Sequence, residues 1–140
     1  MNTKRFLLAV VVVFIVHQAL GYLIHQVLLM GLYEQTENLW RPAAEIKHGI
    51  MILNGLIWAF LFVCIFSKGY EGKGLMEGIR YGFWIGLLIS IPFAYDTYAV
   101  MPIPYSLALS WLIYSTIQII ICGAVAALLY KKESGRGATA

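Results

Sequence analysis

The sequence predicts an all-α fold, a single membrane domain over residues 1–140 that forms a bundle of four transmembrane helices. Two observations predict it. Apolar residues make up 61% of the chain and charged residues 12%, whereas a soluble domain is about 45–50% apolar and about 25% charged. Four stretches are also long and apolar enough to cross a bilayer, which takes roughly 20 residues at about 1.5 Å each. These stretches are Phe6–Met30, Gly49–Ser67, Leu75–Ala94 and Tyr105–Tyr130.

The same composition excludes several other classes of protein. Mean hydropathy is +0.78, which excludes a disordered chain. The net charge of +3 lies in short loops, so the chain lacks the basic face of a nucleic-acid-binding domain. Two cysteines, Cys64 and Cys122, are too few for a disulfide scaffold. The expected main partner is therefore the lipid bilayer, and no nucleic acid is expected.

The first stretch begins like a signal peptide, because Lys4 and Arg5 precede it. Its apolar run is longer than the usual 7–15 residues or so, and no small-residue cleavage site precedes Gly21. We therefore expect an uncleaved signal anchor. Its polar positions share one half of the helix, which we expect to face the bundle, while Val12 and Val13 face lipid. These polar and small positions are His17, Gln18, Gly21, Tyr22, His25 and Gln26.

Basic residues predict the orientation of the bundle. Eight lie on the side of the two chain ends: Lys4, Arg5, Lys68, Lys73, Arg80, Lys131, Lys132 and Arg136. Only Arg41 and Lys47 lie on the other side. Cytoplasmic loops of membrane proteins carry an excess of Lys and Arg. The bias predicts that both termini are cytoplasmic, in a multi-pass protein of a bacterial inner (plasma) membrane.

The third stretch carries a ridge of small residues that recur every four positions: Gly74, Gly78, Gly82, Gly86, Ser90 and Ala94. Small residues let helices approach closely in lipid, where close van der Waals contact drives association. The ridge either seats this helix against its neighbours in one bundle or forms an interface between copies of the chain. Pro92 is expected to kink the helix, and Asp96–Pro104 reads as a short turn.

Three amides lie near the middle of their stretches: Gln18, Asn54 and Gln118. Amide side chains hydrogen-bond between helices in membranes. We therefore expect these three to form a polar cluster at mid-depth that holds the bundle together.

Histidines are the strongest candidates for chemistry, because imidazole can bind metal or haem or relay protons. His25 and His48 are expected at a similar depth, and His17 lies deeper. Glu45 and His48 have the Glu-x-x-His spacing that places two ligands on one helix face in di-metal bundles. Such bundles need two of these motifs, and the chain has one. An interfacial hydrogen-bonded pair is therefore favoured over a metal or haem site of His25, His48 and Glu45.

Three further segments resemble parts of a known class of membrane proteins. They are Asn38-Leu39-Trp40-Arg41-Pro42, Gly78-Ile79-Arg80-Tyr81-Gly82, and a fourth stretch that runs from Trp111 to Leu129-Tyr130-Lys131. With the four stretches, these segments resemble uncharacterised small four-span integral membrane proteins of bacteria. The resemblance covers the whole chain and implies fold and location, with no activity, catalytic residue or cofactor.

The leading functional hypothesis is a non-enzymatic membrane protein that acts through helix–helix contacts, as a homo-oligomer or as an accessory subunit of a membrane protein partner, with the ridge as its contact surface. The chain has no Cys-x-x-Cys motif and no acidic residue deep in a span, which disfavours thiol redox chemistry and carboxylate-driven transport. The alternative is a redox or transport protein that uses His17, His25 and His48 as haem or metal ligands or as proton relays. No cofactor is required by the leading hypothesis.

Overall fold

The structure, a computed structural model, describes residues 3–130, and these residues form helices joined by short connections. The long helices are α1 (Thr3–Tyr22), α3 (His48–Gly69), α4 (Leu75–Val100) and α5 (Tyr105–Leu129). Between α1 and α3 lie a π-helical turn η1 (Leu23–Leu28), the short helix α2 (Met30–Glu34), and two 3₁₀ turns, η2 (Glu37–Leu39) and η3 (Ala43–Glu45). No strand occurs between residues 3 and 130. The predicted basic segment of Lys131, Lys132 and Arg136 lies outside the described residues.

Four helical segments are long and apolar enough to cross a membrane: Thr3–Leu28, His48–Gly69, Leu75–Val100 and Tyr105–Leu129. The prediction of an all-α fold with four long apolar helices is therefore confirmed, and the chain has the helices of a multi-pass membrane protein. The predicted turn Asp96–Pro104 is too long, because α4 continues through Pro92 to Val100. Within this extension the Thr97 hydroxyl is satisfied by the helix itself, because it donates to the Phe93 carbonyl at 2.6 Å.

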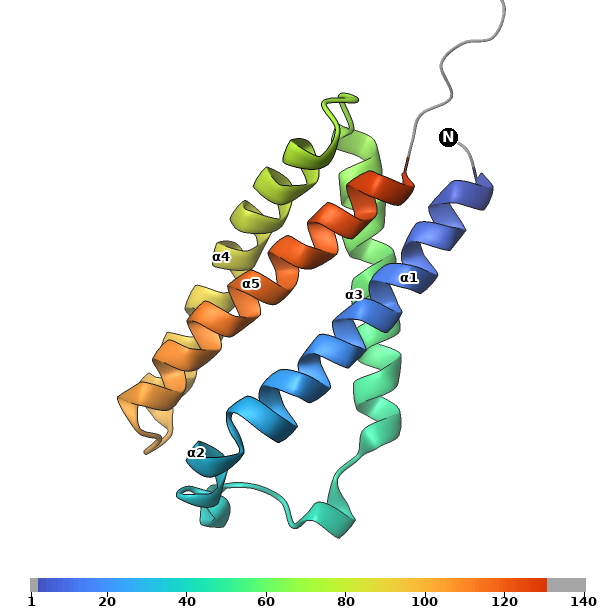
Figure 1. Cartoon of the computed structure of the whole chain (residues 1–140). Coiled ribbons are helices and arrows are strands. Elements are labelled where there is room, and N and C mark those ends of the chain that lie inside the picture. The colour runs from blue at the N-terminus through green and yellow to red at the C-terminus, as the bar shows by residue number, and fades with distance from the viewer. Residues whose placement is uncertain (1–2, 131–140) are drawn as a thin grey trace, which may run out of the picture.

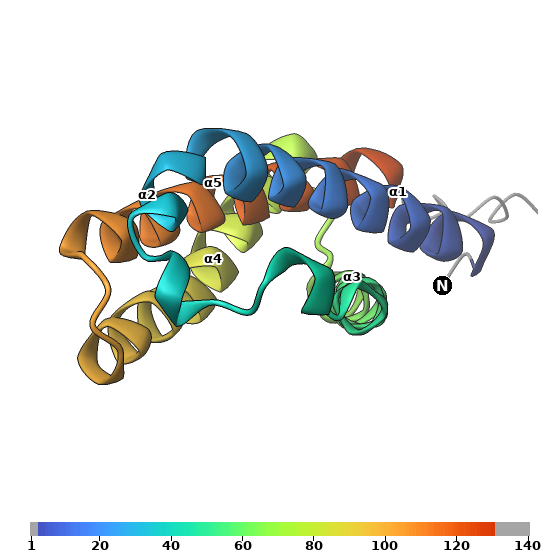
Figure 2. The ribbon, with the colours of Figure 1, turned by 90° about the horizontal axis from the view of Figure 1, so that it is seen from below.

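The main contacts of the four long helices follow the order α4, α5, α1, α3. Helices α3 and α4 also touch, since the Tyr81 hydroxyl of α4 donates to the Phe62 carbonyl of α3 at 2.7 Å. The first turn of α1 and the last turn of α5 lie at one end of the molecule, called here the termini end (Figure 1). At the opposite end, called the α2 end, lie α2, η2, η3 and the turn at residues 101–104. Helix α3 packs on α1 and runs at an angle to the other three, so it diverges from α4 towards the α2 end (Figures 1 and 2).

The small-residue ridge of α4 faces α5, and its members Gly78, Gly82, Gly86, Ser90 and Ala94 are buried. A Cβ atom added at Gly78 would lie 2.1 Å from the carbonyl oxygen of Gly123 in α5, and one at Gly82 would lie 2.6 Å from that of Ile119. The two backbones can meet this closely only because these positions lack side chains. Gly74 does not belong to the contact: nothing lies within 4 Å of its Cβ position. Because α5 of the same chain covers the ridge, it offers no free surface to a second copy.

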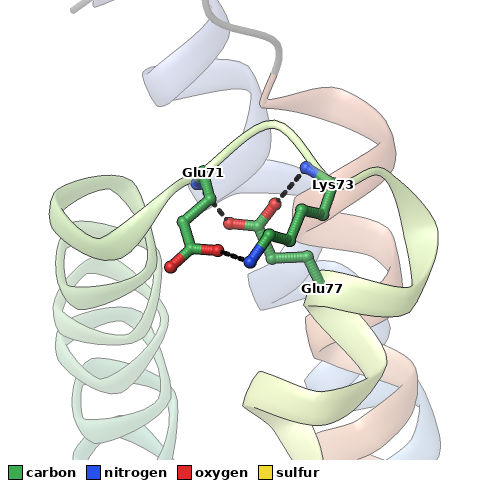
Figure 3. A network of polar contacts seen from close by, with 3 residues as sticks. All are labelled: Glu71, Lys73 and Glu77. Carbon is green, nitrogen blue, oxygen red and sulfur yellow. Dashed lines mark hydrogen bonds and ion pairs between the residues drawn. The ribbon is translucent and has the colours of Figure 1, made fainter.

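The connection between α3 and α4 is organised by the buried Glu77 carboxylate (Figure 3). Its two oxygens accept the backbone N–H groups of Glu71 and Lys73 at 2.5 and 2.7 Å. Gly72 and Gly74 supply the positive φ angles of +81° and +75° that turn the chain back towards this carboxylate. Glu77 therefore satisfies two backbone donors of the connection just before α4. Its negative charge in the first turn of α4 also suits the positive end of the helix dipole.

The exposed side chains of Lys73 and Glu71 also form an ion pair in this connection (Figure 3). The hydrogen bond from Lys73 lowers the pKa of the Glu71 carboxyl below its ordinary value. The contribution of this pair to stability is therefore present at neutral pH and is lost as the pH falls through the lowered pKa.

Replacing Glu77 with alanine is expected to lower the free energy of unfolding by about 1–2 kcal/mol, because two backbone donors lose a charged acceptor. Glu77→Gln keeps one acceptor oxygen and should lose less. Equilibrium unfolding of the protein in mixed micelles measures both effects. The control is Glu71→Gln, which breaks only the exposed ion pair and should change stability far less. Equal effects of Glu77→Ala and Glu71→Gln would show that Glu77 does not organise the connection.

Candidate binding pocket

A pocket of about 1200 Å³ opens at the α2 end, where α3 and α4 have diverged. Its walls come from η1, α2, residues 37–46, the first turn of α3, the last turns of α4 with Met101, and Trp111 of α5. Four aromatic side chains line it: Tyr33, Trp40, Phe93 and Trp111. Its polar and charged lining consists of His25, Gln26, Glu34, Glu37, Asn38 and Arg41, with Thr97 from α4. Large apolar pockets with a few polar groups are the usual form of a small-molecule site.

The π-helical turn at Leu23–Leu28 places His25 on the wall of this pocket. Its wider turn is closed by the N–H of Leu29, which donates to the Ile24 carbonyl five residues earlier at 2.9 Å. Ile24 and Leu29 are both buried, so packing on either side fixes the turn. Single π-helical turns occur often at functional sites, and the sequence carried no signal for this one.

A chain of hydrogen bonds joins α5 to His25 through Tyr33. The Trp111 indole N–H donates to the Tyr33 hydroxyl oxygen at 2.7 Å, and that hydroxyl lies 2.7 Å from Nδ1 of His25. Burial raises the pKa of Tyr33, an effect that the Trp111 hydrogen bond opposes, so the hydroxyl keeps its proton. Because its oxygen accepts from Trp111, this proton is free to donate to Nδ1. In the tautomer in which Tyr33 donates to Nδ1, the ring proton of His25 is on Nε2, and Nε2 makes no hydrogen bond within residues 3–130.

Aromatic rings pack around this hydrogen-bonded chain. The ring of Trp40 lies edge-on to those of Tyr33 and Trp111, with centroids 5.5 and 6.1 Å apart. The Trp40 indole N–H donates to the hydroxyl of buried Thr36 at 2.9 Å. Edge-to-face pairs of this kind add stability beyond the area they bury. Ring contacts and hydrogen bonds therefore hold one aromatic wall of the pocket together.

Charged side chains line the rim of the pocket. Arg41, Glu34 and Glu37 are exposed, and each lines the pocket. In the described part of the chain, none of the three forms an ion pair with another residue. The rim thus presents one positive and two negative groups that remain available to a ligand.

The predicted metal set of His25, His48 and Glu45 is not assembled. His25 is engaged by Tyr33, whereas Glu45 and His48 are exposed and do not line the pocket. Glu45 ends η3 and His48 begins α3, with extended backbone at Ile46 between them, so the Glu-x-x-His spacing does not fall on one helix. Among the residues that the structure describes, no group of three or more His, Cys, Asp and Glu side chains could hold a metal ion.

The predicted amide cluster of Gln18, Asn54 and Gln118 is divided between two helix contacts. Gln118 of α5 donates its Nε2–H to the His17 carbonyl of α1 at 2.8 Å. The Gln18 carboxamide lies against Gly55 of α3, where a Cβ atom would be 2.7 Å from its oxygen. Asn54 is exposed and joins neither contact. The two glutamines therefore tie α1 to α5 and to α3 separately.

His17 lies away from the pocket. Its ring stacks on that of Trp58 in α3, with centroids 4.3 Å apart, and its Nδ1 is buried without a hydrogen-bond partner in the described residues. The three histidines therefore occupy three different environments, and His25 is the one that lines the pocket.

Comparison with known proteins gives no further constraint: no family model, curated protein or solved structure matches this chain. The resemblance to small four-span bacterial membrane proteins thus depends on the sequence features alone.

Proposed function

We propose that this chain is a multi-pass membrane protein that binds an amphipathic small molecule in the pocket at the α2 end. The observation that carries the proposal is the aromatic pocket of about 1200 Å³ with His25 on its wall, fixed by Tyr33 and Trp111. Apolar rings suit the body of such a ligand, and the His25 imidazole, whose Nε2 makes no hydrogen bond in the described residues, supplies a partner for its polar part. The role proposed is binding, with no chemical step.

The location of the site follows from the charge bias of the loops. With both termini cytoplasmic, in a bacterial inner membrane, the α2 end faces away from the cytoplasm. A ligand would then reach the pocket from the non-cytoplasmic side of the membrane or from the leaflet of the bilayer on that side.

The two hypotheses drawn from the sequence, helix–helix contact and histidine chemistry, each agree with a binding role only in part. A role through helix–helix contacts, as an oligomer or accessory subunit, would need a surface other than the ridge, because α5 covers the ridge. The histidine-based alternative shares His25 with the proposed site, but His17 and His48 lie elsewhere. Ligand binding at His25 is therefore the version that the geometry supports best.

The test uses the anionic aromatic amphipath 1-anilinonaphthalene-8-sulfonate with the full chain in lipid nanodiscs. Its fluorescence should show a saturable component that empty nanodiscs lack. His25→Leu should weaken this binding about tenfold, because a half-buried polar partner of the ligand is lost. The matched control is His48→Leu, which removes an exposed histidine that does not line the pocket.

We expect the control to bind as the native protein does. Binding that does not saturate, or equal weakening by His25→Leu and His48→Leu, would contradict the proposal.

A further inference from the structure

The pocket is lined by ends of two helices long and apolar enough to span a membrane, as well as by the connection between α1 and α3. Met51 of α3 and Phe93 and Thr97 of α4 line it, although α3 packs on α1 and diverges from α4. Met51 and Phe93 are both exposed. In a membrane, the space between two spanning helices that separate is accessible to lipid. A ligand can therefore enter between α3 and α4 directly from the bilayer.

The depth of the pocket matches the polar–apolar boundary of a lipid. Met51 lies in the first turn of α3, and Thr97 lies in the last turn of α4, so the pocket is at the ends of two membrane-spanning helices. Tyr33 and Trp40 also line it, and such amphipathic rings favour the membrane–water interface. Its volume of about 1200 Å³ also exceeds the roughly 300–1,000 Å³ typical of drug-sized ligands.

The rim charges select the head group. Arg41 is a partner for a phosphate, and Glu34 and Glu37 are partners for an ammonium group. A zwitterionic head group matches both signs, whereas an anionic one meets two carboxylates with a single arginine. We infer that the occupant of the pocket is a zwitterionic phospholipid drawn from the bilayer, with its phosphate at Arg41, its ammonium at Glu34 and Glu37, and the upper part of a chain against the aromatic wall. This inference rests on the proposed binding function.

The experiment offers the detergent-purified full chain an equimolar mixture of dioleoyl phosphatidylethanolamine and dioleoyl phosphatidylglycerol, and counts the lipids retained by native mass spectrometry. The native protein should retain phosphatidylethanolamine in preference. Arg41→Gln should weaken retention of both lipids about fivefold, the upper range for an exposed charge pair. Glu34→Gln combined with Glu37→Gln should weaken retention of phosphatidylethanolamine, leave retention of phosphatidylglycerol equal or stronger, and so remove the preference.

The matched control is Arg80→Gln combined with Glu71→Gln, which removes the same charge types at the termini end of the molecule. It should leave the preference unchanged. Equal retention of the two lipids by the native protein, or loss of the preference in the control, would overturn the inference. Saturable binding of 1-anilinonaphthalene-8-sulfonate without any retained phospholipid would overturn the lipid inference and leave the proposed binding function in place.

Discussion

Replacing Gly78 with leucine is expected to lower the free energy of unfolding by about 3 kcal/mol, at the upper end of the usual cost of overpacking. The Cβ atom would lie 2.1 Å from the Gly123 carbonyl oxygen and 2.6 Å from Cβ of Ala127. A backbone oxygen cannot turn aside as a flexible side chain can, so α4 and α5 must separate. Because apolar burial gains little in lipid, close contact supplies most of the association, and its loss is not offset elsewhere.

Equilibrium unfolding in mixed micelles measures this change. The control is Gly49→Leu in α3, where nothing lies within 4 Å of the added Cβ atom and where leucine favours the helix more than glycine does. This variant should be as stable as the native protein or slightly more so. Gly123→Leu should behave like Gly78→Leu, since the two glycines face each other. Equal stability of the Gly78 and Gly49 variants would show that the α4–α5 contact is not close-packed.

The number and type of the long helices could be predicted because a bilayer imposes a minimum length and an apolar composition on each span. The end of α4 could not be predicted in this way. Pro92 lacks one backbone donor, but it does not stop the helix, which reaches Val100. Asp96 and Thr97 looked like turn residues, yet both lie in the last turns of α4.

The inward face of α1 was predicted from polarity and is wrong in part. Val13 was expected to face lipid and is 0% exposed, whereas Tyr22 was expected to face the bundle and is 69% exposed. Lipid solvates apolar side chains well, so polarity alone does not choose the buried face of a membrane helix. Ala9 and Val13 are buried in the core beside Val63 and Ala126 of neighbouring helices.

The sequence indicated His25 as a candidate site residue of what proved to be the pocket. It did not predict the residues that hydrogen-bond with His25. Tyr33 and Trp111 are 78 positions apart, and nothing in their spacing predicts that the tryptophan donates to the tyrosine. The metal hypothesis assumed that Glu45 and His48 share a helix, but the extended backbone at Ile46 separates them. Local spacing could not reveal this break.

Replacing Trp111 with alanine is expected to lower the free energy of unfolding by about 3–5 kcal/mol, the usual cost of removing a buried aromatic side chain. Trp111 is 3% exposed, and its ring lies 5.1 Å from that of Phe93 and 6.1 Å from that of Trp40, measured between centroids. The control is Trp84→Ala. Trp84 is 67% exposed, and its loss should change stability by about 0.5 kcal/mol or less, as at other exposed sites.

Trp111→Phe separates the hydrogen bond from the packing of the ring, because phenylalanine keeps an aromatic ring but has no N–H. We expect it to lower the free energy of unfolding by about 1 kcal/mol, the net value of one hydrogen bond. If Tyr33 positions His25 only through Trp111, this variant should also weaken binding of 1-anilinonaphthalene-8-sulfonate, and by less than His25→Leu does. If Trp111→Ala were no less stable than Trp84→Ala, the aromatic wall would not be part of the core. A stable Trp111→Phe variant with native binding would instead show that packing alone holds Tyr33 against His25.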